Sequence, residues 1–366
     1  MSVLIIGGGL AGSAAAITLA RAGCKVTLVE REPKPHHKVC GEFLSREALL
    51  YLASLGLDVA ALGAVPIHNV RLASVEATLP FAAMSLTRRK LDEHLLQTAE
   101  LAGANILRGC RVDLLQREPE SHTWRATLGS TTLHADTIFL ATGKHDLRTQ
   151  PRPAGRQCNL IAFKMYYQLT PTQAAALASS VELIFYPGGY AGLQPVEDGT
   201  ANLCCLIQRR ELQRLGGWDA LATHMQTHSP LLRQRLYGAH PLLDKPLAIS
   251  PIPYGYVRET NQTADGLWAL GDQAAVIPSF TGDGMSIALH SGCLAASMYL
   301  QGKSSTQFHH QLHNEVSRQV SLATAISRAL IWPPTRSAIT AAVAVFPTLL
   351  DTVARRTRIK ETALLV

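Results

Sequence analysis

The chain opens with a strand–turn–helix–strand pattern that restricts how its first thirty residues can fold. A short apolar run, SVLII, is followed by the glycine-rich stretch GGGLAG, an alanine-rich helical pattern and a second apolar run that ends at Glu30. This order and length predict one βαβ unit. Glycines at positions 7, 9 and 12 give a GxGxxG spacing directly between strand and helix, and an acid follows 18 residues after the last of them. In this context the pattern predicts a dinucleotide-binding site.

Each residue of this motif has an expected physical role. Gly7 permits the tight turn, Gly9 lets a pyrophosphate approach the backbone, and Gly12 lets the helix pack on the sheet. The N-terminus of the helix offers unpaired N–H groups to the phosphates. We expect Glu30 to accept hydrogen bonds from a ribose hydroxyl and Arg31, the next residue, to contact the same cofactor. The alternative is a glycine-rich turn that binds no ligand.

The rest of the chain divides into segments with a helical or a strand-like hydrophobic pattern. Residues 86–104 form an amphipathic helix, residues 156–260 are rich in strand-like runs, and a buried strand, GLWALGD, then precedes a mostly helical remainder. We predict an α/β fold in which a Rossmann-like domain is joined to an α+β substrate domain with an antiparallel sheet. The predicted boundaries are 1–65, 85–150 and 265–300 for the dinucleotide-binding domain, 66–84 and 151–264 for the substrate domain, and 301–366 for a C-terminal helical region.

Two later segments indicate which dinucleotide is bound. The stretches LTRRKLDEHL and LWALGDQAAVIPSFTGDGMSIALHSGCLAA, together with the first unit, resemble FAD-dependent oxidoreductases of the geranylgeranyl reductase-like and aromatic hydroxylase superfamily, which includes flavin halogenases. The resemblance implies FAD as cofactor and the fold of glutathione reductase and p-hydroxybenzoate hydroxylase. The P-x-x-T-G-x-G run that starts at Pro278 is most similar to the reductase branch. The flavin-binding residues implied by the resemblance are Arg88, Gly271, Asp272, Gly282, Gly284 and Met285.

The segment KVCGEFLS supplies candidate catalytic residues. It resembles the K-x-C-G loop of geranylgeranyl reductase-like flavoproteins, which implies that Cys40 and Gly41 lie beside the isoalloxazine and that Glu42 is close enough to hydrogen-bond a substrate or the loop itself. Tyr190, in YAGLQP, matches the first position of the reductase substrate motif, but Gly192 and Gln194 replace its aromatic residues. We therefore predict Cys40, Glu42 and Tyr190 as catalytic. The alternatives are that Cys40 packs as a small apolar residue and that Tyr190 is a turn aromatic.

The resemblance implies a biosynthetic oxidoreductase acting on a small apolar or aromatic molecule. The leading prediction is hydride transfer from the flavin to a C=C bond. A monooxygenase acting on an aromatic or polyketide-like substrate is the alternative enzyme, and a non-catalytic flavin-binding partner is the alternative of another class. No second GxGxxG occurs, so the predicted electron donor is NAD(P)H that binds transiently or a separate reductase.

Charge and cysteine content limit the partners. The net charge is +7, and from residue 301 onward eight basic residues stand against three acidic ones. This distribution predicts contact with a membrane surface or an acidic carrier protein, and a solvated helical face is the plainer alternative. No aromatic residues interleave with the basic ones, so no nucleic-acid site is expected. Seven cysteines without a CxxC pair predict reduced thiols, no metal site and a cytoplasmic, or membrane-peripheral, protein without a transmembrane helix.

Overall fold

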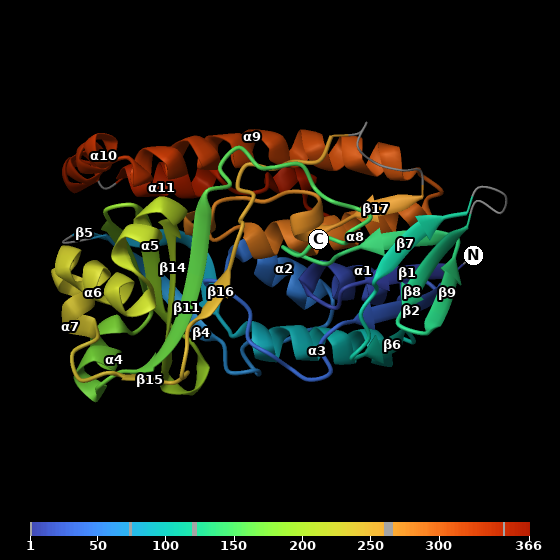
Figure 1. The fold of residues 1–366 in the computed structure, drawn as a ribbon, viewed down its shortest axis with the longest axis horizontal. Helices are drawn as coiled ribbons and strands as arrows, with labels where there is room; N and C mark the ends of the chain where they lie inside the picture. The colour runs from blue at the N-terminus through green and yellow to red at the C-terminus, as the bar shows by residue number, and fades with distance from the viewer. Residues whose placement is uncertain (1, 73–74, 119–122, 260–265, 347) are drawn as a thin grey trace.

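The computed structural model describes residues 2–72, 75–118, 123–259, 266–346 and 348–366. The two larger of three described sheets lie side by side along the long axis of the molecule, and a long C-terminal helix crosses both of them (Figure 1). The N-terminal glycine turn and the helices around it belong to the first sheet, and the strands from the middle of the chain form the second. This arrangement confirms the predicted α/β class with its separate, antiparallel-rich second sheet.

Five described strands form a parallel sheet in the order β17-β10-β1-β2-β6. Parallel sheets are covered on both faces, and here the two faces have different covers. Val3 and Ile5 of β1 belong to a core shared with helices, whereas Leu4 and Ile6 belong to a core formed with an antiparallel meander. The strands are β1 (Ser2–Ile6), β2 (Lys25–Glu30), β6 (Asn105–Arg108), β10 (Thr137–Leu140) and β17 (Leu267–Ala269), and the meander is β7 (Leu114–Arg117), β8 (Trp124–Leu128) and β9 (Thr131–Ala135).

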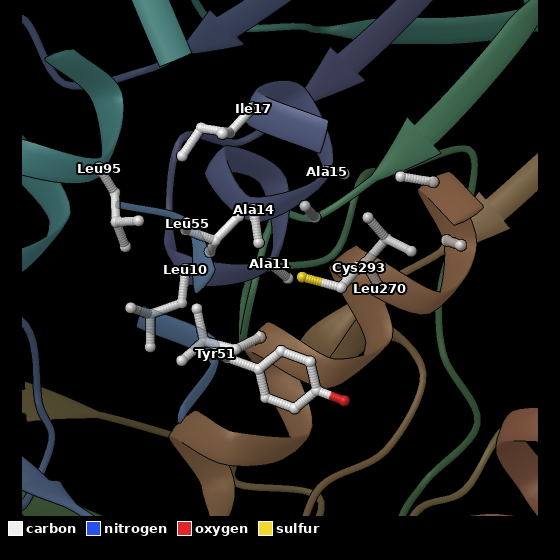
Figure 2. Close-up of a cluster of buried hydrophobic side chains, with 14 of the residues drawn as sticks. Leu10, Ala11, Ala14, Ala15, Ile17, Tyr51, Leu55, Leu95, Leu270 and Cys293 are labelled. Atoms are coloured by element: carbon white, nitrogen blue, oxygen red, sulfur yellow. The ribbon is translucent and has the colours of Figure 1, made fainter. Parts of the chain in front are cut away.

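Small residues let the helices pack closely on the face of the parallel sheet that carries Val3 and Ile5. The helices are α1 (Leu10–Arg21), α2 (Arg46–Ser54), α3 (Arg88–Leu101) and α8 (Gly284–Leu300). A Cβ at Gly12 would lie 1.9 Å from the Gly7 carbonyl oxygen, and one at Gly292 would lie 2.3 Å from the Ala11 carbonyl oxygen. Alanines of α1 face Cys293 of α8 in this interface (Figure 2). The close packing fixes where the N-termini of α1 and α8 lie.

Eight described strands form the second sheet in the order β15-β11-β14-β13-β12-β4-β5-β3, and a ninth, β16, pairs with β11. The β12–β4 pair is parallel and the other pairs are antiparallel. Apolar side chains on one face pack against short helices. The strands are β3 (Phe43–Leu44), β4 (Val65–Leu72), β5 (Val75–Ser85), β11 (Leu160–Gln168), β12 (Ser180–Tyr186), β13 (Gly189–Pro195), β14 (Thr200–Gln208), β15 (His240–Pro241) and β16 (Leu247–Ile249). The helices are α4 (Pro171–Leu177), α5 (Arg209–Leu215), α6 (Trp218–His228) and α7 (Pro230–Arg235).

The C-terminal region is helical, as predicted. It contains α9 (Ser305–Ile331), α10 (Pro333–Val345) and α11 (Thr348–Arg356). Helix α9 begins with a capping box in which Ser304 and Gln307 satisfy each other's backbone N–H groups, and it runs along the top of the molecule in Figure 1. After α11 the chain returns to the middle of the molecule. Within the described residues, every helix is too short or too polar to cross a bilayer.

Candidate active site

A cavity of about 960 Å³ lies at the carboxyl ends of the parallel strands, between the two sheets. Open α/β sheets bind their ligands at this edge. The walls come from the turn after β1, the end of β2, the loop of residues 36–43, the start of α8, and residues 247–254. The volume is at the upper end of that of small-molecule sites, so it can hold a dinucleotide together with part of a second molecule.

The first glycine turn forms one end of the cavity. Gly7 has φ +106°, and a Cβ there would lie 2.4 Å from the Ala141 carbonyl oxygen, so only glycine fits. Gly9 is the N-cap of α1, and no side chain caps the helix. The first N–H groups of α1 therefore face the cavity without a competing side chain, which suits an anionic group. Gly12 lies inside α1 and serves its packing.

Glu30 lies at the end of β2 and is held in place by the backbone. The Gly8 N–H donates to Oε2 at 2.7 Å, and the Glu32 N–H donates to Oε1 at 3.0 Å. Each carboxylate oxygen keeps further lone-pair capacity, so Glu30 can still accept from ribose hydroxyls. Arg31 also lines the cavity, and its half-exposed side chain pairs with Glu32 at 2.9 Å.

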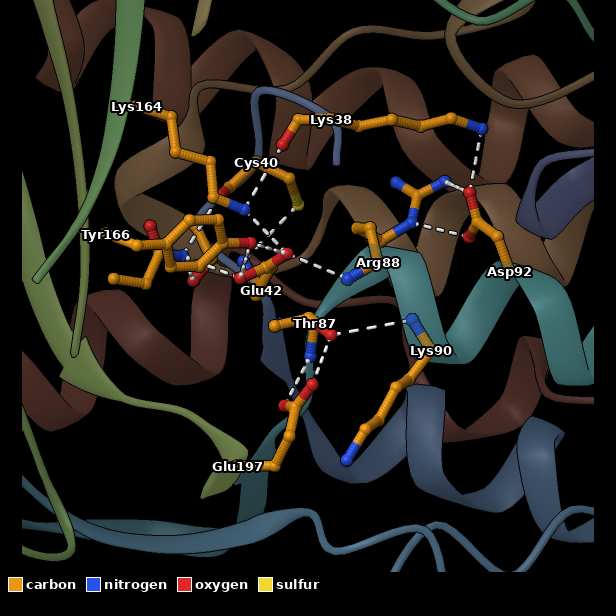
Figure 3. A network of polar contacts seen from close by, with 12 residues as sticks. Lys38, Cys40, Glu42, Thr87, Arg88, Lys90, Asp92, Lys164, Tyr166 and Glu197 are labelled. Carbon is orange, nitrogen blue, oxygen red and sulfur yellow. Dashed lines mark hydrogen bonds and ion pairs between the residues drawn. The ribbon is translucent and has the colours of Figure 1, made fainter. Parts of the chain in front are cut away.

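Basic side chains converge beside the first turn. Asp92 accepts from Arg88 Nε at 2.7 Å and from Lys38 Nζ at 2.7 Å, as Figure 3 shows. Burial alone would raise the pKa of Asp92, but the two cations keep it below its usual value. The Arg88 guanidinium would lie 3.5 Å from a Cβ at Gly9. A fixed positive cluster therefore stands where the sequence predicts a pyrophosphate.

Two further turns line the cavity, one at Gly271 and Asp272, which packs beside Ala11 of α1, and one at residues 282–284. Gly271 has φ +55°, and Asp272 pairs with Lys144 at 3.1 Å. Gly282 has φ +69°, and a Cβ there would lie 2.5 Å from the Phe43 ring. Helix α8 then begins without a side-chain cap, so its N–H groups are also open. The flavin-binding residues predicted in these two turns all line the cavity: Gly271, Asp272, Gly282, Gly284 and Met285.

The loop of residues 36–43 is fixed by Glu42, whose side chain is fully buried. Its carboxylate pairs with Lys164 Nζ at 2.6 Å and accepts from the Tyr166 hydroxyl at 2.8 Å and from the Arg88 backbone N–H at 2.7 Å (Figure 3). It also accepts from Asn202 Nδ2 at 3.0 Å. Burial raises the pKa of Glu42, and Lys164 opposes that shift. Glu42 lines the cavity, but both of its carboxylate oxygens are already paired or hydrogen-bonded within the protein. Its role in this structure is therefore to fix the loop.

Two thiols border the same cavity. Cys40 and Gly41 both line it, and the Glu42 N–H donates to Cys40 Sγ at 3.3 Å. Cys204 of β14 also lines it, and burial raises the pKa of that thiol to about 12. Cys204 is therefore a protonated wall residue at neutral pH. The catalytic assignment of Cys40 stays a prediction.

Tyr190 is buried, and it is not among the described residues that line the cavity. Its hydroxyl lies 3.3 Å from Ser279 Oγ, and its ring meets Phe280 edge-on. Tyr190 therefore packs behind the residues that line the cavity. This position does not support the direct catalytic role that the sequence predicts for it. The sequence did not single out Tyr254, which does line the cavity and accepts from the Ser279 N–H at 3.2 Å.

The residues present fit FAD. An acidic group at the end of β2 suits a ribose, the uncapped N-termini of α1 and α8 suit a diphosphate and an electron-rich ring edge, and basic groups lie between them. Thr142 lines the cavity. Its hydroxyl oxygen is buried and has no hydrogen-bond partner in the described part of the chain. A polar cofactor would satisfy it.

Comparison with known proteins agrees with this site. A family model described as "FAD binding domain" matches residues 1–324, so the chain belongs to this family of FAD-binding proteins. Menaquinone reductase of Mycobacterium tuberculosis is 25% identical over 361 residues, which cover 92% of this chain and 86% of the relative. Digeranylgeranylglycerophospholipid reductase 2 of Methanosphaera stadtmanae is 26% identical over 320 residues, which cover 82% and 77%. The myxobacterial chondrochloren halogenase has the same fold, with a TM-score of 0.77 at 20% identity over 100% of this chain and 92% of that one.

These findings confirm the predicted class. The protein is an FAD-dependent oxidoreductase, and its relatives by sequence include reductases.

The carboxylate of Glu30 should contribute directly to FAD affinity. Glu30→Gln keeps one oxygen, which cannot serve the two backbone N–H groups and a ribose hydroxyl as two charged oxygens can. Since hydrogen bonds to charged groups are worth about 1.5–3 kcal/mol, we expect FAD to bind at least about tenfold more weakly. Quenching of flavin fluorescence measures this. Glu32→Gln, a matched change at a residue off the cavity wall, should bind FAD like the wild type, and equal affinities for both variants would contradict the assignment.

The Glu42–Lys164 pair should dominate the stability of the loop. Lys164→Met leaves a buried carboxylate without its cation, and breaking such a pair costs about 3–5 kcal/mol. Urea unfolding of the protein without FAD measures this cost. The control is Lys90→Met, which removes an exposed pair with Asp198 and should cost less than about 1 kcal/mol. A loss for Lys164→Met no larger than that of the control would show that the buried pair does not stabilise the fold.

Proposed function

We propose that this oxidoreductase reduces a carbon–carbon double bond in a largely apolar, isoprenoid-bearing small molecule. The single observation that carries the proposal is the contrast between the two ends of the cavity. One end is lined by basic residues and open helix N-termini. The other is lined by an apolar wall that comprises Ala162, Cys204, Cys205, Leu247, Ala248, Ile249, Pro251, Ile252, Pro253, Tyr254, Val276 and Ile277. The names of the two reductase relatives support the same substrate class.

Bound FAD would supply the hydride, and the chain's own residues have three tasks around it. The glycine turns and Glu30 hold and orient the nucleotide. The apolar wall excludes water and orients the hydrocarbon. The Tyr254 hydroxyl lies on that wall, and burial raises its pKa to about 12, so it keeps its proton at neutral pH and can donate it. Cys40 remains the other candidate proton donor.

A monooxygenase is the second candidate function. The same fold occurs in an FAD-dependent halogenase, so the fold is not restricted to reductases. The electron donor in either case is proposed to be NAD(P)H or a separate reductase. Both reactions need the same flavin site, so the geometry of the FAD end favours neither. The apolar far end favours a hydrocarbon over a polar aromatic substrate.

An anaerobic turnover experiment tests the reaction type. The FAD-loaded protein is reduced with dithionite under nitrogen and mixed with menaquinone or a geranylgeranyl lipid. After air has re-oxidised any menaquinol to the quinone, we expect the recovered product to have gained two hydrogens without oxygen, as detected by mass spectrometry. Tyr254→Phe should slow this step about 100-fold if the hydroxyl donates the proton. A product that forms only with oxygen, and that carries label from isotopic dioxygen, would show that the protein is a monooxygenase.

We also propose that the protein meets this substrate at an anionic membrane surface. Trp332, Val345, Phe346 and Leu349 are exposed around α10 and α11, at 60%, 68%, 60% and 40%. Such a group of exposed apolar side chains is typical of an interaction surface. Arg328 and Trp332 line a second hollow together with Cys158, and Cys158 also lines the main cavity. The exposed Trp332 and the neighbouring Arg328, which border the cavity through Cys158, suit anionic phospholipid, from which an apolar substrate would enter.

Vesicle sedimentation tests the membrane proposal. We expect binding to vesicles that contain phosphatidylglycerol, weaker binding to neutral phosphatidylcholine vesicles, and at least about tenfold loss of binding in Trp332→Ser/Phe346→Ser. Tyr237→Ser is the matched control, because Tyr237 is an exposed aromatic residue that follows α7. Absence of vesicle binding, or equal loss in the control, would overturn the proposal in favour of an acidic protein partner or a solvated face.

A further inference from the structure

The last residues of the chain are anchored beside the flavin-binding part of the molecule. After α11, Thr357, Arg358 and Ile359 are buried. Glu361 forms an ion pair with Arg46, and the Leu365 N–H donates to the Tyr51 hydroxyl at 3.2 Å. The match to the family model ends at residue 324, so this anchoring is a feature of the chain beyond the matched region.

Arg358 is the centre of this contact. Its guanidinium lies 3.2 Å from Glu47 of α2 and 3.8 Å from Asp283, and it stacks 3.6 Å from the centre of the Phe81 ring of β5. The side chains of Arg358 and Glu47 are each 7% exposed, and that of Asp283 is 0% exposed. Ion pairs screened this little by water are strongly coupled. One cation thus links the C-terminal segment to α2, to the start of α8 and to β5 of the second sheet.

Asp283 connects this cation to the cavity. Gly282 and Gly284, its neighbours in the chain, both line the cavity, whereas Asp283 is not among the described lining residues. Asp283 is the N-cap residue of α8, but its side chain does not cap the helix. Its fully buried carboxylate lies 3.8 Å from Arg358. Any force on that carboxylate therefore acts on the backbone that presents the open N–H groups of α8.

We propose that Arg358 is a positioning residue for the flavin, which acts through Asp283 to hold the turn of residues 282–284 against the cofactor and to set the charge behind it. The inference rests on the assignment of this turn to FAD. It explains why a segment outside the family match is buried against the start of α8. It also predicts that the flavin senses the ionisation of a residue that it does not touch.

The charge of Asp283 depends on groups from four elements. Arg358 comes from the C-terminal segment, Glu47 from α2, Ser286 from α8, and Gln319 of α9 donates to Oδ2 at 3.4 Å. Burial raises the pKa of Asp283 most, Arg358 lowers it and Glu47 raises it, which places it at about 7. The carboxyl is therefore neutral below this pH and charged above it. Loss of Arg358 removes the stabilising cation, so the pKa must move further upward.

The test compares variants of the full chain loaded with FAD. Arg358→Met retains an unbranched apolar stem but removes the charged guanidinium, and we expect FAD to bind about tenfold more weakly by fluorescence titration. In the wild type the absorbance of bound FAD should change with an inflection near pH 7. The inflection should move to higher pH in Arg358→Met, disappear in Asp283→Asn, and return towards the wild-type value in Arg358→Lys. A role confined to folding would not produce these pH profiles.

Two outcomes would overturn the inference. If Arg358→Met and Asp283→Asn bind FAD and titrate like the wild type, Arg358 does not position the turn. Asp283→Asn changes no volume, so it provides the answer if Arg358→Met fails to fold. Gly282→Ala, which is strained at φ +69° and clashes with Phe43, distinguishes failure of the role of Arg358 from failure of the assignment of this turn to FAD. If it loses FAD while the other variants do not, only the inference fails; if it also binds FAD normally, the turn is not part of the flavin site.

Discussion

One buried carboxylate sets the shape of the site. Glu42 has φ +62°, in a region that side-chain-bearing residues rarely adopt, and it places its charge between the two sheets. A buried charge is costly unless it is paired and hydrogen-bonded. Here Lys164 and Tyr166 come from β11, Asn202 from β14 and a backbone N–H from the start of α3. The loop that carries Cys40 is therefore fixed by strands more than a hundred residues away, and the cavity is formed before a ligand arrives.

The sequence predicted the parts of the site that depend on local geometry. The turn at Gly7 and the acid at the end of β2 lie where their spacing placed them, because backbone sterics and strand direction determine both. Glu42 was interpreted as a possible acid, since nothing near it in the chain reveals partners on β11 and β14. Tyr190 matched a family spacing, yet its position on β13 turns its ring toward Phe280. Pairings such as Arg358 with Asp283 depend on tertiary packing, which no local pattern encodes.

The division of the cavity into a charged end and an apolar end connects the fold to the proposed chemistry. The parallel sheet supplies open N–H groups at two helix termini, which suit a negatively charged nucleotide. The second sheet supplies β11, β14 and the neighbouring segment 247–254, which form the apolar wall. An oxidoreductase with these two ends brings a fixed redox cofactor against a hydrocarbon. Reduction and oxygenation share this requirement, so the surroundings of the reacting bond, and not the cofactor site, decide between them.

An experimental structure of the FAD complex tests the central claim most directly. The account predicts the adenosine ribose beside Glu30, the diphosphate at the first N–H groups of α1, and the isoalloxazine between the Cys40–Gly41 segment and the turn at Gly282. The Glu42–Lys164 pair should remain intact, with little movement of the loop. A flavin ring bound away from the turn at Gly282, or a loop that must unfold its buried carboxylate to admit FAD, would contradict the account.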